Sequence, residues 1–387
     1  MTYQELCEKF NIQLPEYAEH YFGDFLKEYD RSKPLLSVAD AEMVCDATGL
    51  PEDAKAALVK CAQIINADDD GHLCGSFLAD LTVYKRKPWV NYIYQPDLFT
   101  VEGLYPEQVG WILVAVMLAN TLNNKKPPVD LNQENLNAFK GYSTNCFNSL
   151  GYWGIVEWHW NMLCASGSMF LFGILKFVPS EFTSDFPIIT DGTRYVSLAG
   201  GEFFVGKEGE LVDCEEKSVG KTSYYEDDEK YIGHVISAKG AVDLNKTEFD
   251  KKIWKDFLRG GYHTMDIHIP PKVEYTPEKF KEAFKMALEF YNDYYPDHKT
   301  NAFACYSWIL SAQLDKVLPE GSNILKVNSG MHLLPQIGKF DGDLMFIRKG
   351  SSLQQRIADE CAKGTEFHYG IMYVPLDEVE TFGKETV

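Results

Sequence analysis

Two titratable side chains follow one another at strand spacing in the C-terminal half of the chain. From Thr264 to Ile269 apolar residues alternate with polar ones, so a strand here would place Asp266 and His268 on one face, about 7 Å apart between their Cα atoms. A central α/β strand is normally apolar on both faces. The pair is either a polar contact satisfied by neighbouring loops or a general base. For a base near neutral pH, the unperturbed pKa of His268, about 6.5, suits better than that of Asp266.

Other candidate nucleophiles lack activating partners. Cys305 stands in a β-like run in which nothing would lower its pKa, which predicts a buried structural thiol and leaves a thiol-dependent hydrolase as an outlying alternative. Ser307 and Ser322 have no G-x-S-x-G turn, which argues against a serine hydrolase. The nine cysteines contain no C-x-x-C pair, so neither a disulfide framework nor a zinc site is predicted, and no metal is expected.

Two further patterns have structural interpretations. Ala304, Tyr306 and Trp308 are spaced two residues apart, so in a strand they would share one face. This spacing predicts side chains that pack across the strand rather than a platform on which bases stack. His332 is a lone histidine in a predicted loop, and we expect it to be solvated.

The elements before these residues are predicted to be helical. Residues 1–145 show four-residue apolar spacing, as in Tyr17, Tyr21 and Phe25, and Pro106 stands where a first-turn proline belongs. Aspartates at 68–70 could suggest a calcium loop but lack its alternating ligands, so a capped helix start is predicted. We therefore expect a helical N-terminal domain.

From about residue 146 the pattern changes to that of a mixed sheet. Residues 146–250 predict an antiparallel meander, with a long β-like run at 169–178 and a hairpin turn at Asp191 and Gly192. An α/β or α+β domain over 146–387 is predicted, with residues 251–387 as its second half. In that half we expect strands at 262–269, 302–310, 344–348 and 369–374, and helices at 276–295, 313–317 and 353–363.

Composition excludes several classes of function. The formal net charge of −20 disfavours nucleic acid and anionic membrane as partners. The longest apolar run, residues 109–119, is shorter than the roughly 20 residues needed to span a bilayer. No signal peptide is recognised at the N-terminus, so a cytoplasmic protein is expected.

Several short and unusual sequence motifs occur in order in the second half of the chain, and together they resemble those of a known family. The match is best over 250–374, looser over 150–250, and over 1–150 rests on helical character. The chain resembles bacterial acyltransferases that have an N-acyltransferase N-terminal domain and a GNAT-like C-terminal domain. The motifs that carry this resemblance are His268-Ile269-Pro270, Ser307-Trp308-Ile309-Leu310, Ser322-Asn323-Ile324 and Ser352-Leu353-Gln354-Gln355-Arg356.

The resemblance implies a fold in which two parallel strands, here 262–269 and 302–310, splay apart around acyl-CoA. The pyrophosphate would rest on loop 270–276, because the first turn of a helix offers free N–H groups and a partial positive charge. The thiolate product would receive a proton or hydrogen bond from Ser322 or Asn323. Cofactor contacts are expected from Ile269, Lys272, Val273, Glu274, Tyr275, Thr276 and Ser307.

The implied activity is transfer of an acyl group, expected to be acetyl, from CoA to an amine on a small molecule or peptide. In that reaction Asp266 or His268 would take the amine proton. The sequence departs from the superfamily in two places: loop 270–276 has no glycine and carries Glu274, and no arginine flanks Gly173. These departures keep a second function open, a non-catalytic module that binds acyl-CoA or another metabolite.

Overall fold

The computed structural model describes residues 1–14, 16–84, 99–124, 133–344 and 347–383, and they form two compact units, Met1–Leu171 and Phe172–Val387. The boundary that we predicted between 145 and 146 falls inside a helix, α7 (Gln133–Leu150). The first unit extends further because α7 and α8 (Trp158–Ala165) both pack against α6 (Pro106–Asn124).

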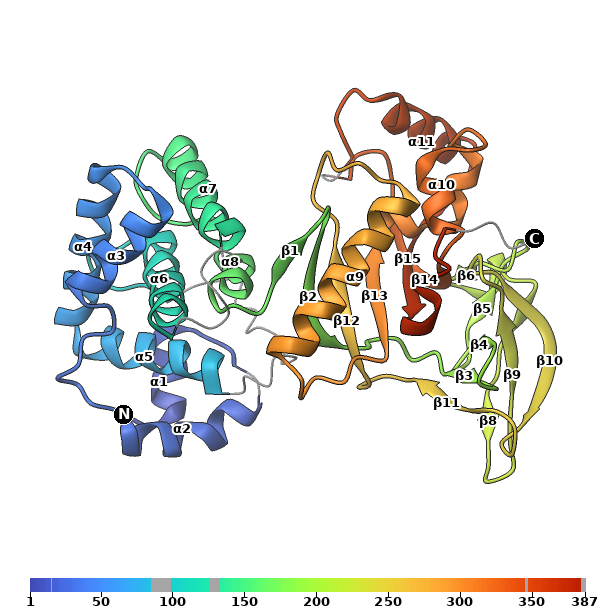
Figure 1. Cartoon of the computed structure of the whole chain (residues 1–387), viewed down its shortest axis with the longest axis horizontal. Helices are drawn as coiled ribbons and strands as arrows, with labels where there is room; N and C mark the ends of the chain where they lie inside the picture. The colour runs from blue at the N-terminus through green and yellow to red at the C-terminus, as the bar shows by residue number, and fades with distance from the viewer. Residues whose placement is uncertain (15, 85–98, 125–132, 345–346, 384–387) are drawn as a thin grey trace. The chain divides into compact units, whose positions relative to one another are not determined.

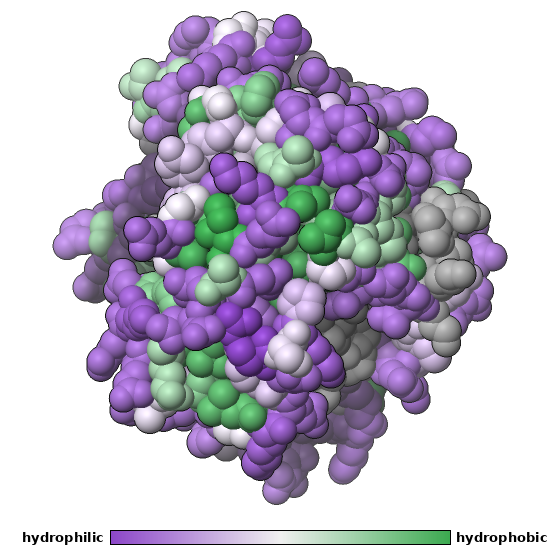
Figure 2. Space-filling model, turned by 90° about the vertical axis from the view of Figure 1, so that its left-hand side faces the viewer, coloured by the Kyte–Doolittle hydropathy of each residue, from purple (hydrophilic) through white to green (hydrophobic). Residues whose placement is uncertain are grey.

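The first unit is helical, as predicted (Figure 1). Its centre is α6, which begins at Pro106 and buries every residue from Val109 to Ala119. This burial explains the longest apolar run, and no described helix is long and apolar enough to cross a membrane. The face shown in Figure 2 is mostly hydrophilic with scattered apolar patches. The remaining helices are α1 (Tyr3–Phe10), α2 (Glu16–Glu28), α3 (Val38–Thr48), α4 (Glu52–Ala67) and α5 (Asp69–Tyr84).

The second unit is built on a six-stranded mixed sheet, in the order β1-β2-β12-β13-β15-β14. Strands β12 and β13 are parallel, whereas β2 with β12, β13 with β15 and β14 with β15 are antiparallel. The strands are β1 (Phe170–Phe172), β2 (Leu175–Glu181), β12 (His263–His268), β13 (Ala302–Ser307), β14 (His332–Phe340) and β15 (Phe367–Pro375).

The meander forms two further sheets, ordered β10-β9-β4-β3-β11, with β8 beside β9, and β6-β5-β7. The predicted hairpin at Asp191 joins β3 to β4, and the Asp191 carboxylate accepts hydrogen bonds from the N–H groups of Thr193 and Arg194. Their strands are β3 (Ile188–Thr190), β4 (Tyr195–Leu198), β5 (Phe204–Val205), β6 (Leu211–Val212), β7 (Gly220–Lys221), β8 (Tyr225–Glu226), β9 (Lys230–Ile236), β10 (Val242–Asp250) and β11 (Lys255–Leu258).

Helix α9 (Pro277–Tyr294) covers one face of the mixed sheet (Figure 1). Its Phe284 stacks on Phe303 of β13, with ring centroids 4.4 Å apart. The opposite face packs against the meander, where Ala304 and Tyr373 share an apolar core with Ile188. Beyond β13 lie short helices η3 (Trp308–Leu310), η4 (Ala312–Lys316) and α10 (Asn323–Asn328), and then α11 (Ser352–Ala362).

Three predicted elements were wrong in detail. The run at 169–178 is two strands, because Gly173 adopts a positive φ of 55° and turns the chain between β1 and β2. The strand at 302–310 ends at Ser307 and continues as η3. The strand expected at 344–348 is absent among its described residues, 344, 347 and 348, while positions 345 and 346 lie outside the described part. The strand that pairs with β15 on the edge away from β13 is β14 instead.

Strand β14 also corrects the interpretation of His332. This residue begins β14, and its Nε2 hydrogen-bonds Glu378 Oε2 at 2.8 Å. Its ring stacks on Tyr373, with centroids 4.7 Å apart, so His332 is a partnered, half-buried residue.

Candidate active site

Strands β12 and β13 begin side by side and then part. Their parallel pairing runs through three positions and ends with Asp266 opposite Ala304. Beyond this point β12 continues along β2, with His268 opposite Lys176, while β13 continues along β15, with Ser307 opposite Gly370. The sheet therefore opens between the carboxyl ends of two parallel strands, which confirms the splayed pair expected from the sequence.

The parting ends the hydrogen-bonded pairing between the facing edges of β12 and β13. Every non-proline residue carries one N–H donor and one C=O acceptor, and a ladder normally satisfies both. No strand pairing joins residues 267–268 of β12 to residues 305–307 of β13 in the described sheet. Main-chain groups on these edges can therefore bond a flat, polar group such as a thioester or an amide.

Loop 270–276 leads from β12 into α9 and offers further donors. Thr276 caps the helix by accepting a hydrogen bond from the N–H of Lys279, and Pro277 occupies the first turn. Within the described ranges, the main-chain N–H groups of Lys272, Val273 and Glu274 donate to no residue. Free N–H groups next to a helix N-terminus form an arrangement that suits an anion.

Lys272 compensates in part for the missing glycine of this loop. Its φ of 65° lies in the left-handed region, which glycine adopts most readily. The loop therefore makes a glycine-like turn with a residue that also carries an exposed ammonium group. The neighbouring Lys279 is held by Glu282 at 2.9 Å, whereas the Glu274 carboxylate is exposed.

The residues adjacent to Asp266 in the sequence do not reveal the environment that raises its pKa. The side chain is half-buried on β12, and burial raises its pKa to about 7. The nearby hydroxyl groups of Ser180 and Thr264 lower the pKa of Asp266 but do not cancel the effect of burial. A carboxyl group with this pKa can accept a proton near neutral pH.

The environment of His268 shifts its pKa in the opposite direction, downward. Burial, with a smaller contribution from the ammonium group of Lys176, lowers the pKa of His268 to about 4. The imidazole is therefore neutral near pH 7 and a weaker base than Asp266, which reverses the preference drawn from unperturbed values. Lys176 was missed by sequence reasoning, because it lies some ninety residues away and only the register of β2 against β12 brings it opposite His268.

Tyr275 joins the loop to α10. Its hydroxyl donates to Asn328 Oδ1 at 3.3 Å, and Asn328 Nδ2 donates to the carbonyl of Ile309 at 2.8 Å. Burial, and then proximity to Cys305, raise the pKa of Tyr275, so the phenol stays protonated. Cys305 is buried, as predicted, and burial followed by the nearby Asp266 raises its pKa, which makes it an unreactive thiol.

The other predicted residues have local roles. Ser322 caps α10 by accepting from the N–H of Leu325 at 3.3 Å, and Asn323 is an exposed first residue of that helix. In the described ranges neither side chain bonds β12, β13 or loop 270–276; Asn328, at the other end of α10, does so instead. Ser307 accepts from the N–H of Ile309 at 3.4 Å where β13 ends. Ile269 is half-buried and directly follows β12.

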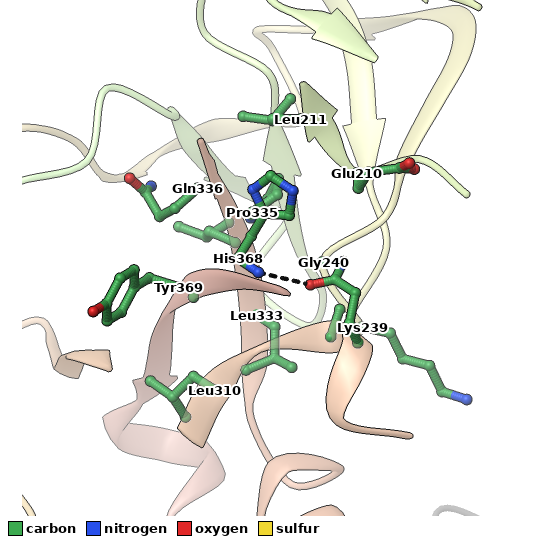
Figure 3. A pocket seen from close by; sticks show the side chains of 14 residues that line it. Glu210, Leu211, Lys239, Gly240, Leu310, Leu333, Pro335, Gln336, His368 and Tyr369 are labelled. Carbon is green, nitrogen blue, oxygen red and sulfur yellow. Dashed lines mark hydrogen bonds between the residues drawn. The ribbon is translucent and has the colours of Figure 1, made fainter. Parts of the chain in front are cut away.

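A small cavity is lined by residues of η3, η4, β14 and β15 (Figure 3). Its lining includes Leu310, Gln336 and the buried His368, whose main-chain N–H donates to Gln313 Oε1 at 3.2 Å. The volume of about 20 Å³ is room for one water molecule. This cavity is too small for a substrate. No group of three or more His, Cys, Asp or Glu side chains that could hold a metal ion occurs in the part of the chain described.

Comparison with known proteins agrees with this geometry. The profile of the GNAT-like C-terminal domain family matches residues 170–371, and the chain belongs to this family. A solved acyltransferase in complex with decanoyl-CoA and teicoplanin is 14% identical, has a TM-score of 0.55, and is matched over 97% of this chain and 100% of that one.

A second solved structure, an acyltransferase mutant in complex with octanoyl-CoA, gives the same identity and TM-score over 97% of this chain and 99% of that one. These likenesses show a shared fold. No curated protein matches the chain.

Proposed function

We propose that this protein is an acyl-CoA-dependent N-acyltransferase, which transfers an acyl group from the CoA thioester to an amine. The observation that carries the proposal is the parting of β12 from β13 directly before a loop in which the N–H groups of Lys272, Val273 and Glu274 donate to no described residue. A thioester substrate needs both features: an opening lined by main-chain groups for its pantetheine arm, and anion donors for its phosphates.

The chain's own residues suit the parts of acyl-CoA. The N–H groups of Lys272, Val273 and Glu274 would bind the pyrophosphate, with the Lys272 ammonium neutralising part of its charge. The thioester arm would lie between β12 and β13, where their pairing ends. A main-chain N–H of β12 would polarise the thioester carbonyl, since a fixed donor stabilises the oxyanion that forms on attack.

Asp266 is the proposed general base. The amine nitrogen attacks the thioester carbonyl carbon, the C–N bond forms, and the Asp266 carboxylate accepts the proton that nitrogen loses. The C–S bond then breaks, and the CoA thiolate takes up one proton to leave as the free thiol. Neutral His268 lies on the same face of β12 and would help to orient the amine by hydrogen bonding.

Tyr275 is the better candidate for the proton delivered to sulfur. Its phenol stays protonated and lies beside Cys305, at the parting of the strands. Ser322 and Asn323, proposed for this role from the sequence, bond no described residue of the strands or the loop. Replacing Tyr275 by phenylalanine removes the donor but keeps the ring packed on Phe280, at 4.7 Å.

The proposal also concerns the length of the acyl chain and the chemical class of the acceptor. The sequence suggested acetyl, whereas the two acyltransferases of similar fold were solved with decanoyl-CoA and octanoyl-CoA. One of those structures also contains teicoplanin, which agrees with a small-molecule acceptor for this chain. The acyl chain is best determined by offering acetyl-, octanoyl- and decanoyl-CoA side by side.

A second function, binding of acyl-CoA without transfer, is favoured by the exposed Glu274 carboxylate in the loop. The test measures CoA release together with amide formation by mass spectrometry, with each acyl-CoA and a panel of primary amines. The transferase proposal predicts amine-dependent release of CoA and an amide of the expected mass. Binding of acyl-CoA without either product would favour the second function.

A further inference from the structure

Tyr306 is an exposed aromatic residue on a central strand. It follows Ala304, the last residue of β13 paired with β12, by two positions, so it lies on the same face of the sheet as Asp266. It is 56% exposed, although Ala302, Phe303, Ala304 and Cys305, which precede it on β13, are all buried. Tyr306 packs across to Tyr369 of β15, as predicted, but it stays exposed because β12 and β13 part where a residue of β12 would cover it.

The ring of Tyr306 packs against a neighbouring aromatic ring. It stacks on Tyr369 of β15, with centroids 5.2 Å apart and planes 19° apart, and Tyr369 in turn contacts Phe340 at 5.3 Å. At Gly338 an added Cβ would lie 3.3 Å from the Tyr306 hydroxyl, so the absent side chain leaves room for the ring. One ring face is covered by Tyr369, and binding to the exposed remainder requires little further ordering of the side chain.

The charges next to this aromatic pair exclude one kind of ligand. An open depression beside Tyr369 is lined by Asp341 and Asp343, which form no ion pair with any described residue. The lysine that lines it, Lys339, is bound to Asp213 at 2.8 Å and to Glu366 at 2.9 Å. The local charge is therefore negative, as is the chain's total of −20, and both repel an anionic acceptor.

We propose that Tyr306 and Tyr369 form the acceptor-binding surface, and that the acceptor is a neutral or cationic amine carried on an aromatic body. The proposal rests on the proposed transferase function, since it assigns the acceptor of that reaction. An aromatic body gains offset stacking on Tyr306, which a saturated body of similar size does not. The ammonium form of the amine is attracted both by the tyrosine face and by the neighbouring carboxylates.

The test compares 2-phenylethylamine with 2-cyclohexylethylamine, which share a chain and a charge but differ in aromaticity. Each is titrated by NMR into the whole protein saturated with CoA, so binding is measured without turnover. The parent should bind the aromatic amine about tenfold more tightly. Tyr306→Phe should keep this preference and Tyr306→Leu should lose it. Tyr225→Leu is the matched control, because Tyr225 is also 56% exposed but lies on β8.

Equal binding of the two amines by the parent, or an unchanged preference in Tyr306→Leu, would overturn the proposal. Turnover is then measured separately with the same amines. A protein that binds 2-phenylethylamine through Tyr306 but releases no CoA would refute the transferase function and leave the aromatic site intact. Release of CoA with no preference for the aromatic amine, in parent and variant alike, would refute the aromatic acceptor and leave the transferase.

Discussion

Asp266 and His268 lie two residues apart on one strand, yet their surroundings shift their pKa values in opposite directions. Burial raises the first to about 7 and, with Lys176, lowers the second to about 4. The same loss of water disfavours the charged form of both groups, which is anionic for a carboxyl and cationic for an imidazole. Their alternation was predictable from the sequence, but the burial and the opposing lysine depend on β2, which only the folded sheet places beside them.

The first prediction follows from this raised pKa. The pKa of Asp266 is about 3.9 in the unfolded state and about 7 in the folded state. Between these pH values the folded state binds more protons at Asp266, so the contribution of Asp266 to stability falls as pH rises. At about 1.4 kcal/mol per pKa unit, the loss is at most on the order of 4 kcal/mol. Asp266→Asn removes the titration. In urea unfolding at pH 5 and pH 8, the variant should therefore gain stability relative to the parent at the higher pH. Parallel changes in both proteins would contradict the raised pKa.

The second prediction concerns rate. Asp266→Asn should bind CoA normally and lose about 10²–10⁴ in kcat, the usual effect of removing a general base, whereas His268→Ala should lose less. In the parent, kcat/KM should rise with pH and level off above pH 7, as Asp266 becomes ionised. Steady-state CoA release across pH 5–9 measures both effects. Full activity of Asp266→Asn would place the base on another residue.

The third prediction tests Lys272 as a phosphate ligand. Lys272→Ala should weaken CoA binding a few-fold and flatten its dependence on salt, and Lys272→Glu should weaken it more than tenfold, because the loop then carries two carboxylates. Lys279→Ala is the control, since that ammonium is already bound to Glu282. Calorimetric titration at two salt concentrations gives the affinities. Equal binding by Lys272→Glu and the parent would place the pyrophosphate elsewhere.

At the scale of elements, the strand–loop–helix from β12 through α9 was predictable because its signals are local. Alternation marks the strand, and the capping Thr276 with the following Pro277 marks the helix start. Strand β14 was missed because Pro335 and Gly338 interrupt its pattern, at a place where its register against β15 also shifts. Local pattern therefore found the elements that line the site, and failed where a strand is formed by pairing with a distant partner.

A glycine at the edge of the opening gives the fourth prediction. Gly370 pairs with Ser307, and a Cβ added there would lie 2.3 Å from the carbonyl oxygen of Leu310. Gly370→Ala should therefore displace η3 from β15 and destabilise the fold by about 1–3 kcal/mol. Gly260→Ala is the control, since its nearest contact would be an ordinary 3.5 Å. Similar melting temperatures for the two variants would show that η3 moves freely.

For the whole molecule, the net charge of −20 offers no general attraction to an anionic cofactor. Acyl-CoA must therefore be held by the free N–H groups and the lysine of one loop, which lies in the second unit, and that unit has apolar cores of its own. The fifth prediction is that CoA at about 100 times its Kd adds about 2.7 kcal/mol to the stability of that unit. Calorimetry should show a rise of a few degrees in its transition. No shift at millimolar CoA would argue against CoA as ligand.

The most direct test is a crystal structure of the protein with CoA bound. We expect pyrophosphate oxygens within hydrogen-bonding distance of the N–H groups of Lys272, Val273 and Glu274. The pantetheine arm should lie between β12 and β13, with its sulfur at the sheet opening near Asp266 and Tyr275. CoA bound outside this opening, with loop 270–276 free of phosphate, would contradict this binding mode.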